Sequence, residues 1–309
     1  MPSADSPLDA ITRQGNGVLV IGEALVDIVA NAKRAQPEEH VGGSPANVAL
    51  ALGRLGNPVR LLTALGRDAR GERIERHLTD SGVVVDRRSW VLDRTSTARA
   101  TIHDGAATYD FDITWPLDVN PEPITERVVH VGSIAAFLLP GADAVYRLVE
   151  HVAGDAIVSF DPNIRPALSG NRRSAIARVE SLVEKSDIVK LSDEDAAWLY
   201  PDWPLDAVAE HLLECGARLV AITTGATGAQ LASQRARVQV PAPTVKVRDT
   251  VGAGDTFSAG LIDAALRDLS LLSTLDEDSL FRLGRHAVAR CRSPRPETQG
   301  GSTHRSGVS

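Results

Sequence analysis

Short apolar runs alternate with amphipathic segments along most of the chain. Runs rich in Val, Ile and Leu predict strands at residues 18–22, 60–65, 128–131, 157–161, 188–191 and 219–223. Between them, apolar residues at helical spacing predict helices at residues 47–55, 72–79, 144–152, 174–185, 205–215 and 253–269. Apolar strands separated by helices are typical of a doubly wound, mostly parallel sheet with helices on both faces. The pattern therefore predicts an α/β fold.

Two segments interrupt this alternation. Residues 28–41 run into a Gly-Gly turn, and residues 95–113 hold two β-rich runs on either side of Asp104-Gly105. An Asp-Gly pair between two such runs indicates a β-hairpin. We expect the two segments to form a small β lid over the carboxyl ends of the main strands, where open α/β sheets bind their ligands.

The two ends of the chain differ from the middle. Residues 18–292 carry the α/β pattern, whereas residues 1–17 are expected to form a disordered extension. Residues 293–309 are rich in Ser, Pro, Gly, Arg and Thr and are expected to be disordered, because they offer almost no apolar surface to bury. The unusual sequence after about Ala289 is either a natural divergence or the product of a reading-frame change.

Composition narrows the class of function. The formal net charge is −7, so the chain lacks the basic excess that nucleic-acid binding normally needs. The longest apolar stretch, residues 18–30, is interrupted by Glu23 and Asp27, which argues against a membrane span. Two cysteines, Cys215 and Cys291, show no CxxC or Cys/His spacing typical of zinc sites. A reducing cytoplasm fits this cysteine usage best.

The segment from Asp249 to Phe257 reads Asp-Thr-Val-Gly-Ala-Gly-Asp-Thr-Phe and leads into a predicted helix. Gly252, Ala253 and Gly254 would leave backbone N–H groups free at the helix N-terminus, where phosphate oxygens bind well. Asp255, one turn into the helix, could then act as a base. Taken alone, the segment fits an ordinary acidic first turn equally well.

A second segment, Gly42-Gly43-Ser44-Pro45-Ala46-Asn47, also precedes a predicted helix. Gly43 permits close approach of a ligand to the backbone, and the Asn47 amide can bond two sugar hydroxyls. An ordinary N-capped helix is the simpler interpretation. Asp27, just past the first strand, is a carboxylate of the kind that accepts hydrogen bonds from polyols.

Together these segments resemble the PfkB, or ribokinase-like, family of carbohydrate kinases. Residues 42–56 resemble the N-terminal signature of the family and residues 249–262 its C-terminal signature, with Gly-Ala-Gly-Asp intact. The resemblance extends from about residue 18 to residue 290. It implies an ATP-dependent kinase that uses Mg²⁺, with Asp255 as the base. It also implies an anion hole at Gly252, Ala253 and Gly254, and sugar contacts at Asp27, Gly43, Asn47 and Asp255.

Three further segments are similar to family motifs, and one of them, Thr223-Thr224-Gly225, resembles a T-x-G turn that touches the ATP phosphates. Asp161-Pro162-Asn163-Ile164-Arg165 resembles a D-P-N-x-R segment that lies near the phosphates and magnesium. Residues 190–195 match the position of an N-x-x-E motif, but Ser192 and Asp195 replace its Asn and Glu, and Asp193 and Glu194 are alternative magnesium carboxylates. The resemblance thus implies ATP contacts at Lys190, Ser192, Thr223, Gly225, Gly228 and Gly254, and a phosphate and magnesium region at Asp161, Asn163, Arg165 and Asp195. A monovalent cation, K⁺, near Asp249 is a further implication that the sequence leaves open.

Within the family, Gly-Glu-Ala-Leu-Val-Asp at residues 22–27 and the Asp-Pro-Asn-Ile-Arg segment look most like bacterial fructokinases. D-fructose is therefore the favoured acceptor and fructose 6-phosphate the expected product. 2-Keto-3-deoxygluconate kinase, ribokinase and nucleoside kinase remain alternatives, as does a catalytically weak sugar-binding protein. A dehydrogenase would need G-x-G-x-x-G after the first strand, which is absent. The expected partners are sugar and ATP, and a homodimer is left open.

Overall fold

The computed structural model describes residues 15–31, 36–103, 106–117, 124–242 and 252–291. The predicted disordered tail, the proposed cation position at Asp249 and nearly all of the predicted N-terminal extension lie outside these residues.

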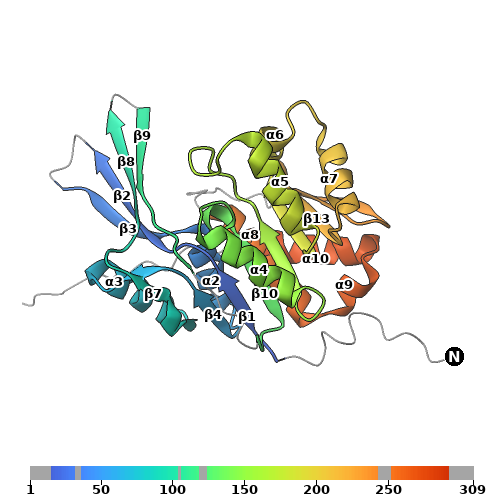
Figure 1. Cartoon of the computed structure of the whole chain (residues 1–309). Helices are drawn as coiled ribbons and strands as arrows, with labels where there is room; N and C mark the ends of the chain where they lie inside the picture. Colours follow the sequence, from blue (N-terminus) through green and yellow to red (C-terminus); the bar gives the residue numbers. More distant parts are fainter. Residues whose placement is uncertain (1–14, 32–35, 104–105, 118–123, 243–251, 292–309) are drawn as a thin grey trace, which may run out of the picture.

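A large sheet forms the centre of the described structure (Figure 1). Seven adjacent strands of this sheet run parallel to one another, and two antiparallel strands complete it at one edge. Among the described residues the nine strands lie in the order β15 (Arg237–Val240), β14 (Ala229–Ala232), β13 (Leu219–Thr223), β12 (Ile188–Ser192), β11 (Ile157–Asp161), β10 (Val128–Gly132), β1 (Val18–Ile21), β4 (Val59–Leu62) and β6 (Val83–Val85). The predicted doubly wound α/β fold is confirmed.

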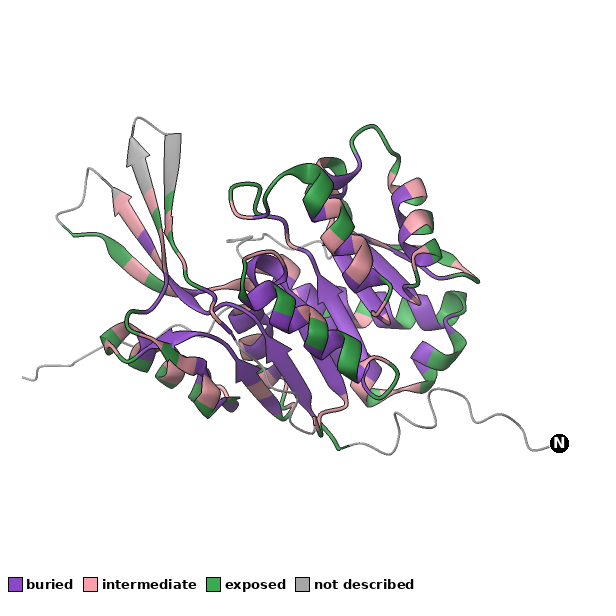
Figure 2. Ribbon diagram, viewed as in Figure 1, coloured by how far each residue is buried: buried purple, intermediate pink, exposed green. Residues whose placement is uncertain are grey.

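Helices cover both faces of this sheet and create two hydrophobic cores (Figure 2). Alternate residues of a strand point to opposite faces, so Val18 and Val20 enter one core while Leu19 and Ile21 enter the other. The first core is closed by α2 (Ser44–Arg54), α3 (Ala69–Thr79), α8 (Ala253–Arg267), α9 (Ser270–Thr274) and α10 (Glu277–Arg290). The second is closed by α4 (Gly141–Val152), α5 (Arg172–Val183), α6 (Asp193–Leu199) and α7 (Leu205–Glu214).

A four-stranded second sheet extends away from the main body at the upper left of Figure 1. Its order is β3 (Glu38–Gly42), β2 (Leu25–Asn31), β8 (Thr97–His103) and β9 (Ala106–Asp112). Strands β8 and β9 pair antiparallel from Thr97↔Asp112 to His103↔Ala106, which confirms the predicted hairpin. Glu39 of β3 pairs with Arg70 and Arg73 of α3, so the second sheet is tied to the body at one point.

The prediction of a single strand at residues 60–65 is wrong. The chain leaves the main sheet after Leu62, where the backbone N–H of Thr63 donates to Ser89 Oγ instead of to a neighbouring strand. Leu65 and Gly66 then form a separate short strand, β5 (Leu65–Gly66), which pairs with β7 (Trp90–Leu92).

Helices α8 and α10 pack at unusually close range. A Cβ placed on Gly260 would lie 2.6 Å from the Cα atom of Ala287, so only glycine allows this approach.

Within the described residues, no helix combines the length and the apolar content needed to cross a bilayer.

Candidate active site

The carboxyl ends of five parallel strands meet at one edge of the main sheet. Strands β1, β10, β11, β12 and β13 end there, and the residues at or just beyond their ends are Glu23, Ser133, Asp161, Ser192 and Thr223. Helices α2 and α8 bring their N-terminal turns together, because Ser44 and Asn47 of α2 contact Asp255 of α8. The predicted site residues therefore converge where open α/β sheets usually bind ligands.

Asp255 is buried and held by two neutral donors. Ser44 Oγ donates to Asp255 Oδ1 at 2.6 Å, and Asn47 Nδ2 donates to Oδ2 at 2.9 Å. Burial raises the pKa of Asp255 more than these two hydrogen bonds lower it, and the nearby carboxylate of Asp161 raises it further. The result is a fixed carboxylate with increased basicity.

The turn before Asp255 has the geometry of an anion site. Gly252 adopts the left-handed conformation with φ 77° and precedes α8 as its N-cap. The first backbone bond inside the helix runs from Thr256 N–H to the Gly252 carbonyl at 2.9 Å, so the Ala253 and Gly254 amides precede this ladder. Unpaired amides and the positive end of the macrodipole both favour phosphate at this position.

Lys190 lies directly beneath this turn. A Cβ on Gly254 would lie 3.0 Å from Lys190 Nζ, which shows how closely the helix approaches the lysine. Lys190 is only 5% exposed, and its Nζ contacts Asp161 Oδ2 at 3.0 Å. Burial lowers the pKa of Lys190, but Asp161, Asp195 and Asp255 together raise it above the ordinary value. The lysine therefore stays charged beside the turn at residues 252–254.

Asp161 has acceptor capacity left for a cation. Its Oδ2 accepts from Lys190 Nζ and from Ser258 Oγ, both at 3.0 Å. Its Oδ1 is buried without a hydrogen-bond partner among the described residues. A carboxylate oxygen in this state fits Mg²⁺ or a water bound to Mg²⁺, because Mg²⁺ prefers oxygen ligands and retains several waters.

Asp195 is occupied by structural hydrogen bonds. Its Oδ2 accepts from both the N–H (2.9 Å) and the Oγ (2.7 Å) of Ser192, which caps the N-terminus of α6. Its Oδ1 accepts from the backbone N–H of Ile164 at 2.7 Å. Asp195 thus joins α6 to the Asp-Pro-Asn segment, while Glu194 is exposed and Asp193 accepts from the N–H of Glu194.

The predicted sugar contacts lie on the side of the second sheet. A Cβ on Gly42 would lie 2.0 Å from Asp27 Oδ2, and one on Gly43, with φ 101°, would lie 2.5 Å from the Glu23 carbonyl. Gly43 is thus required by packing against backbone, whatever the ligand, whereas the atom nearest to Gly42 is the end of the Asp27 side chain. Burial raises the pKa of Asp27, and His40 and Arg165 oppose that effect.

Arg165 and Asn163 form a local pair at the end of β11. Arg165 Nη1 donates to Asn163 Oδ1 at 2.8 Å, and Asn163 has a left-handed φ of 36°. Arg165 is exposed and lowers the pKa of both Glu23 and Asp27. Its charge therefore acts on the sugar-side carboxylates as well as near the expected phosphate region.

The Thr-x-Gly segment forms a tight turn after β13. Thr223 Oγ1 approaches the Leu191 carbonyl at 3.5 Å, and the Thr224 N–H donates to the Gly228 carbonyl at 2.9 Å. Gly225 is exposed at the tip, whereas a Cβ on Gly228 would lie 2.0 Å from the Val240 carbonyl. Gly228 is fixed by its contact with β15, and Gly225 is open to a ligand.

Two residues of the site were missed by sequence reasoning. Ser44 holds the Asp255 carboxylate, and it lies three residues before Asn47 on the same side of α2, a spacing that could have indicated it. Glu23 is buried, its Oε2 accepts from the Ala135 N–H at 3.4 Å, and burial raises its pKa to about 7. Asn47, expected to bind sugar, also donates to Asp255.

Comparisons with known proteins found a matching family, similar curated proteins and similar solved structures. Residues 16–284 match the model of the pfkB family carbohydrate kinases. A fructokinase from Rhizobium leguminosarum bv. trifolii is 34% identical over 277 residues, which cover 85% of each chain. The crystal structure of a fructokinase from Xylella fastidiosa has a TM-score of 0.78 at 25% identity, covering 89% of this chain and 91% of that one.

A third similar protein acts on a different molecule. Aminoimidazole riboside kinase from Salmonella enterica, solved with aminoimidazole riboside and an ATP analogue, has a TM-score of 0.74 at 26% identity. The match covers 90% of this chain and 94% of that structure. With both signature segments converging on Asp255 and the family match extending over most of its length, the chain belongs to the pfkB family of carbohydrate kinases.

Proposed function

We propose that the protein transfers the γ-phosphoryl group of ATP to a sugar hydroxyl, with D-fructose as the preferred acceptor and fructose 6-phosphate as the product. The observation that carries this proposal is the placement of Asp255. It lies one turn after the left-handed Gly252, buried, with both carboxylate oxygens fixed by Ser44 and Asn47. Proximity of a base to an anion site is what in-line phosphoryl transfer requires.

Asp255 is proposed as the general base. Its raised pKa makes the carboxylate a better acceptor for the hydroxyl proton than an ordinary aspartate. Ser44 and Asn47 fix its orientation, since rotation of the side chain would break both hydrogen bonds. The acceptor hydroxyl would lie against Asp255 while its oxygen attacks the γ-phosphorus.

The anion hole and Lys190 are proposed to hold the transferring phosphate. The amides after Gly252, the helix dipole of α8 and the Lys190 ammonium all present positive potential at one place. Asp161 is the residue whose free oxygen fits Mg²⁺, and the ion would neutralise phosphate charge. Thr223 and Gly225 would border the remaining phosphates.

The second sheet is proposed as a lid. Asp27 on β2 and the exposed Arg165 would bind polar groups of the sugar from opposite sides. Closing the sheet over the site would exclude water, which competes with the sugar for the phosphoryl group. The Glu39 ion pairs with α3 would keep one end of the sheet anchored during this motion.

An ADP-release assay tests the reaction and the acceptor together. Fructose, ribose, tagatose, 2-keto-3-deoxygluconate and adenosine are compared by kcat/KM, and the fructose product is located by NMR. The highest kcat/KM for fructose with phosphate on the 6-hydroxyl supports the proposal. A tenfold preference for ribose, 2-keto-3-deoxygluconate or adenosine overturns the acceptor and keeps the kinase. Absence of turnover with every acceptor, while sugar binding persists in calorimetry, favours a sugar-binding protein.

A further inference from the structure

A group of possible metal ligands lies between α5 and α7, on elements that contribute nothing to the candidate active site. Glu180 comes from α5, His211 from α7, and Cys215 caps the C-terminus of α7. His211 Nε2 lies 2.7 Å from Glu180 Oε1 and 3.7 Å from Cys215 Sγ. The three ligand atoms all lie within 4.8 Å of one another, and among the described residues no second group of three meets this criterion.

We propose that Glu180, His211 and Cys215 bind a divalent cation of the zinc type. Zinc takes Cys sulfur at ~2.3 Å and His nitrogen at ~2.0–2.1 Å, so a tetrahedral site separates these two atoms by roughly 3.5 Å. The separation of 3.7 Å between Cys215 Sγ and His211 Nε2 already matches this value. The 2.7 Å contact between His211 and Glu180 is a hydrogen bond and must widen when the metal enters.

Helical spacing explains why the ligands face one another. His211 and Cys215 are four residues apart and so share one face of α7. This spacing is not among those typical of zinc sites, so the sequence alone did not indicate the pair. That face is turned to α5, where Glu180 meets it. The C-terminal end of a helix carries partial negative charge, which favours a cation next to Cys215.

The local charge also favours a cation. The carboxylates of Glu180 and Glu214 put negative charge near Cys215. A bound cation would be attracted by this charge and would stabilise the Cys215 thiolate. Binding would form a metal–sulfur bond, release the thiol proton to solvent and leave His211 neutral, with no change of oxidation state.

The surrounding side chains would restrict the carboxylate and the imidazole. The Tyr200 hydroxyl donates to Glu180 Oε1 at 3.3 Å. The rings of Tyr200 and Trp203 lie edge-on to His211, with centroids 5.4 and 5.5 Å away. Partners of this kind orient ligands in metal sites. Glu180, His211 and Cys215 are each partly exposed, so an ion and a fourth, water ligand can enter from solvent.

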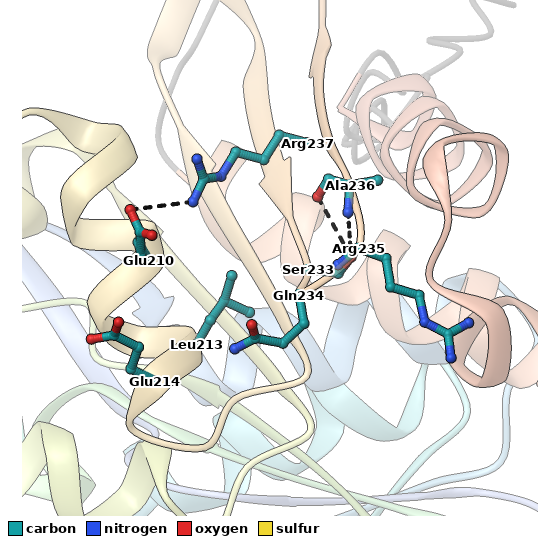
Figure 3. Close-up of a pocket in the computed structure, with 8 residues that line it drawn as sticks. All are labelled: Glu210, Leu213, Glu214, Ser233, Gln234, Arg235, Ala236 and Arg237. Carbon is teal, nitrogen blue, oxygen red and sulfur yellow. Dashed lines mark hydrogen bonds and ion pairs between the residues drawn. The ribbon is translucent and has the colours of Figure 1, made fainter.

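A neighbouring pocket uses a different side of α7. Glu210, Leu213 and Glu214 line that pocket together with residues of the β14–β15 turn (Figure 3). There Glu210 is paired with Arg237 at 3.6 Å. Arg237 thus neutralises the charge of Glu210, which does not take part in the proposed metal site. The metal would link only α5 to α7. We therefore expect it to change stability rather than turnover.

Cobalt binding provides the test, since Co²⁺ reports thiolate coordination by a charge-transfer band in the near ultraviolet. Full-length protein is freed of metal and titrated with CoCl₂, and then with ZnCl₂. We expect one equivalent of Co²⁺ to produce the band, release about one proton in weakly buffered solution, and be displaced by Zn²⁺. Absence of the band at saturating Co²⁺ overturns the proposal.

Two cysteine variants identify the ligand. Cys215→Ser should lose the band, whereas Cys291→Ser, the matched control, should keep it. His211→Ala and Glu180→Gln should weaken Co²⁺ binding at least tenfold. Zn²⁺ should raise the melting temperature of the wild type and of Cys291→Ser but not that of Cys215→Ser, and circular dichroism of each variant checks that it is folded. A band that survives in Cys215→Ser, or disappears in Cys291→Ser, overturns the assignment.

Discussion

Helix α8 carries two buried aspartates, two turns apart, whose surroundings shift their pKa values in opposite directions. Burial raises the pKa of Asp255, and its direct partners, Ser44 and Asn47, are neutral. Burial would also raise the pKa of Asp263, but Arg267, Asn57 and His286 lower it below the ordinary value. His286 Nε2 lies 2.6 Å and Arg267 Nε 2.9 Å from Asp263 Oδ2.

The difference shows that burial alone does not decide what a carboxylate can do. Neutral donors orient Asp255 without strongly stabilising its charge, so the carboxylate remains ready to take a proton. Arg267 stabilises the charge of Asp263, and contacts with His286 and Arg290 make it part of the link between α8 and α10. One helix therefore holds a proposed base at its beginning and a structural ion pair near its end.

Asp255→Asn should have the largest effect on turnover. We expect kcat to fall by ~10²–10⁴, the usual contribution of a general base. The free energy of unfolding at pH 7 should rise, because a buried carboxylate with a raised pKa costs stability once it ionises. Steady-state kinetics and urea unfolding measure the two quantities. Near wild-type turnover would remove Asp255 from the mechanism.

Glu23→Gln extends the comparison to a third buried carboxylate. The folded pKa of about 7 lies above the ordinary value of 4.5, so ionisation costs stability as pH rises from 4.5 to 7. The variant should equal the wild type near pH 4.5 and be more stable by about 3 kcal/mol above pH 7. Urea unfolding across this range provides the measurement. A constant difference at all pH values would contradict the shifted pKa.

Asp263→Asn should act in the opposite sense to Asp255→Asn. It removes the charge that holds Arg267 and His286, and we expect a loss of about 2 kcal/mol of stability, moderated by the exposure of Arg267. Turnover per folded molecule should change little. Because the folded pKa is lowered, the loss of stability should be full above the ordinary value of 3.8 and fade as pH falls through the folded pKa. An increase in stability at pH 7 would break the comparison.

Ser44→Ala should have the smallest effect. It removes the donor to Asp255 Oδ1 and so takes away one cause that lowers the pKa of the proposed base. The acid limb of the kcat/KM profile should move to higher pH, because one hydrogen bond to the charged form is lost. Ser273→Ala, on the exposed side of α9, serves as the control. Identical profiles for both variants would place Ser44 outside the control of Asp255.

The strands at the centre of the main sheet could be predicted because they are buried on both faces. Strands β1, β10 and β11 are fully buried along their length and appear as mostly apolar runs. Strands β14 and β15 were missed because their antiparallel edge position allows polar residues such as Gln230 and Gln239. Helix α6 was missed because its first turn is wholly acidic and was interpreted only as a ligand motif.

In the candidate site, too, some features could be predicted from the sequence and others could not. Asp255 and the glycine turn could be predicted because a short contiguous segment encodes both. The contact between Ser44 and Asp255 spans 211 residues of sequence, and only the packing of α2 against α8 creates it. The hydrogen bonds of Asp195 with Ile164 and of Asn47 with Asp255 could not be predicted either, because only the tertiary fold brings these partners together.

The close contact between Gly260 and Ala287 has a consequence for how this protein can vary. Helix α8 begins at the proposed anion hole and rests against α10 at Gly260, so the position of its first turn depends on the last described helix. Any larger side chain at residue 260 would push the two helices apart and shift the phosphate-facing amides with them. Selection for catalytic activity would therefore preserve Gly260, although it lies about two turns along α8 from Gly252.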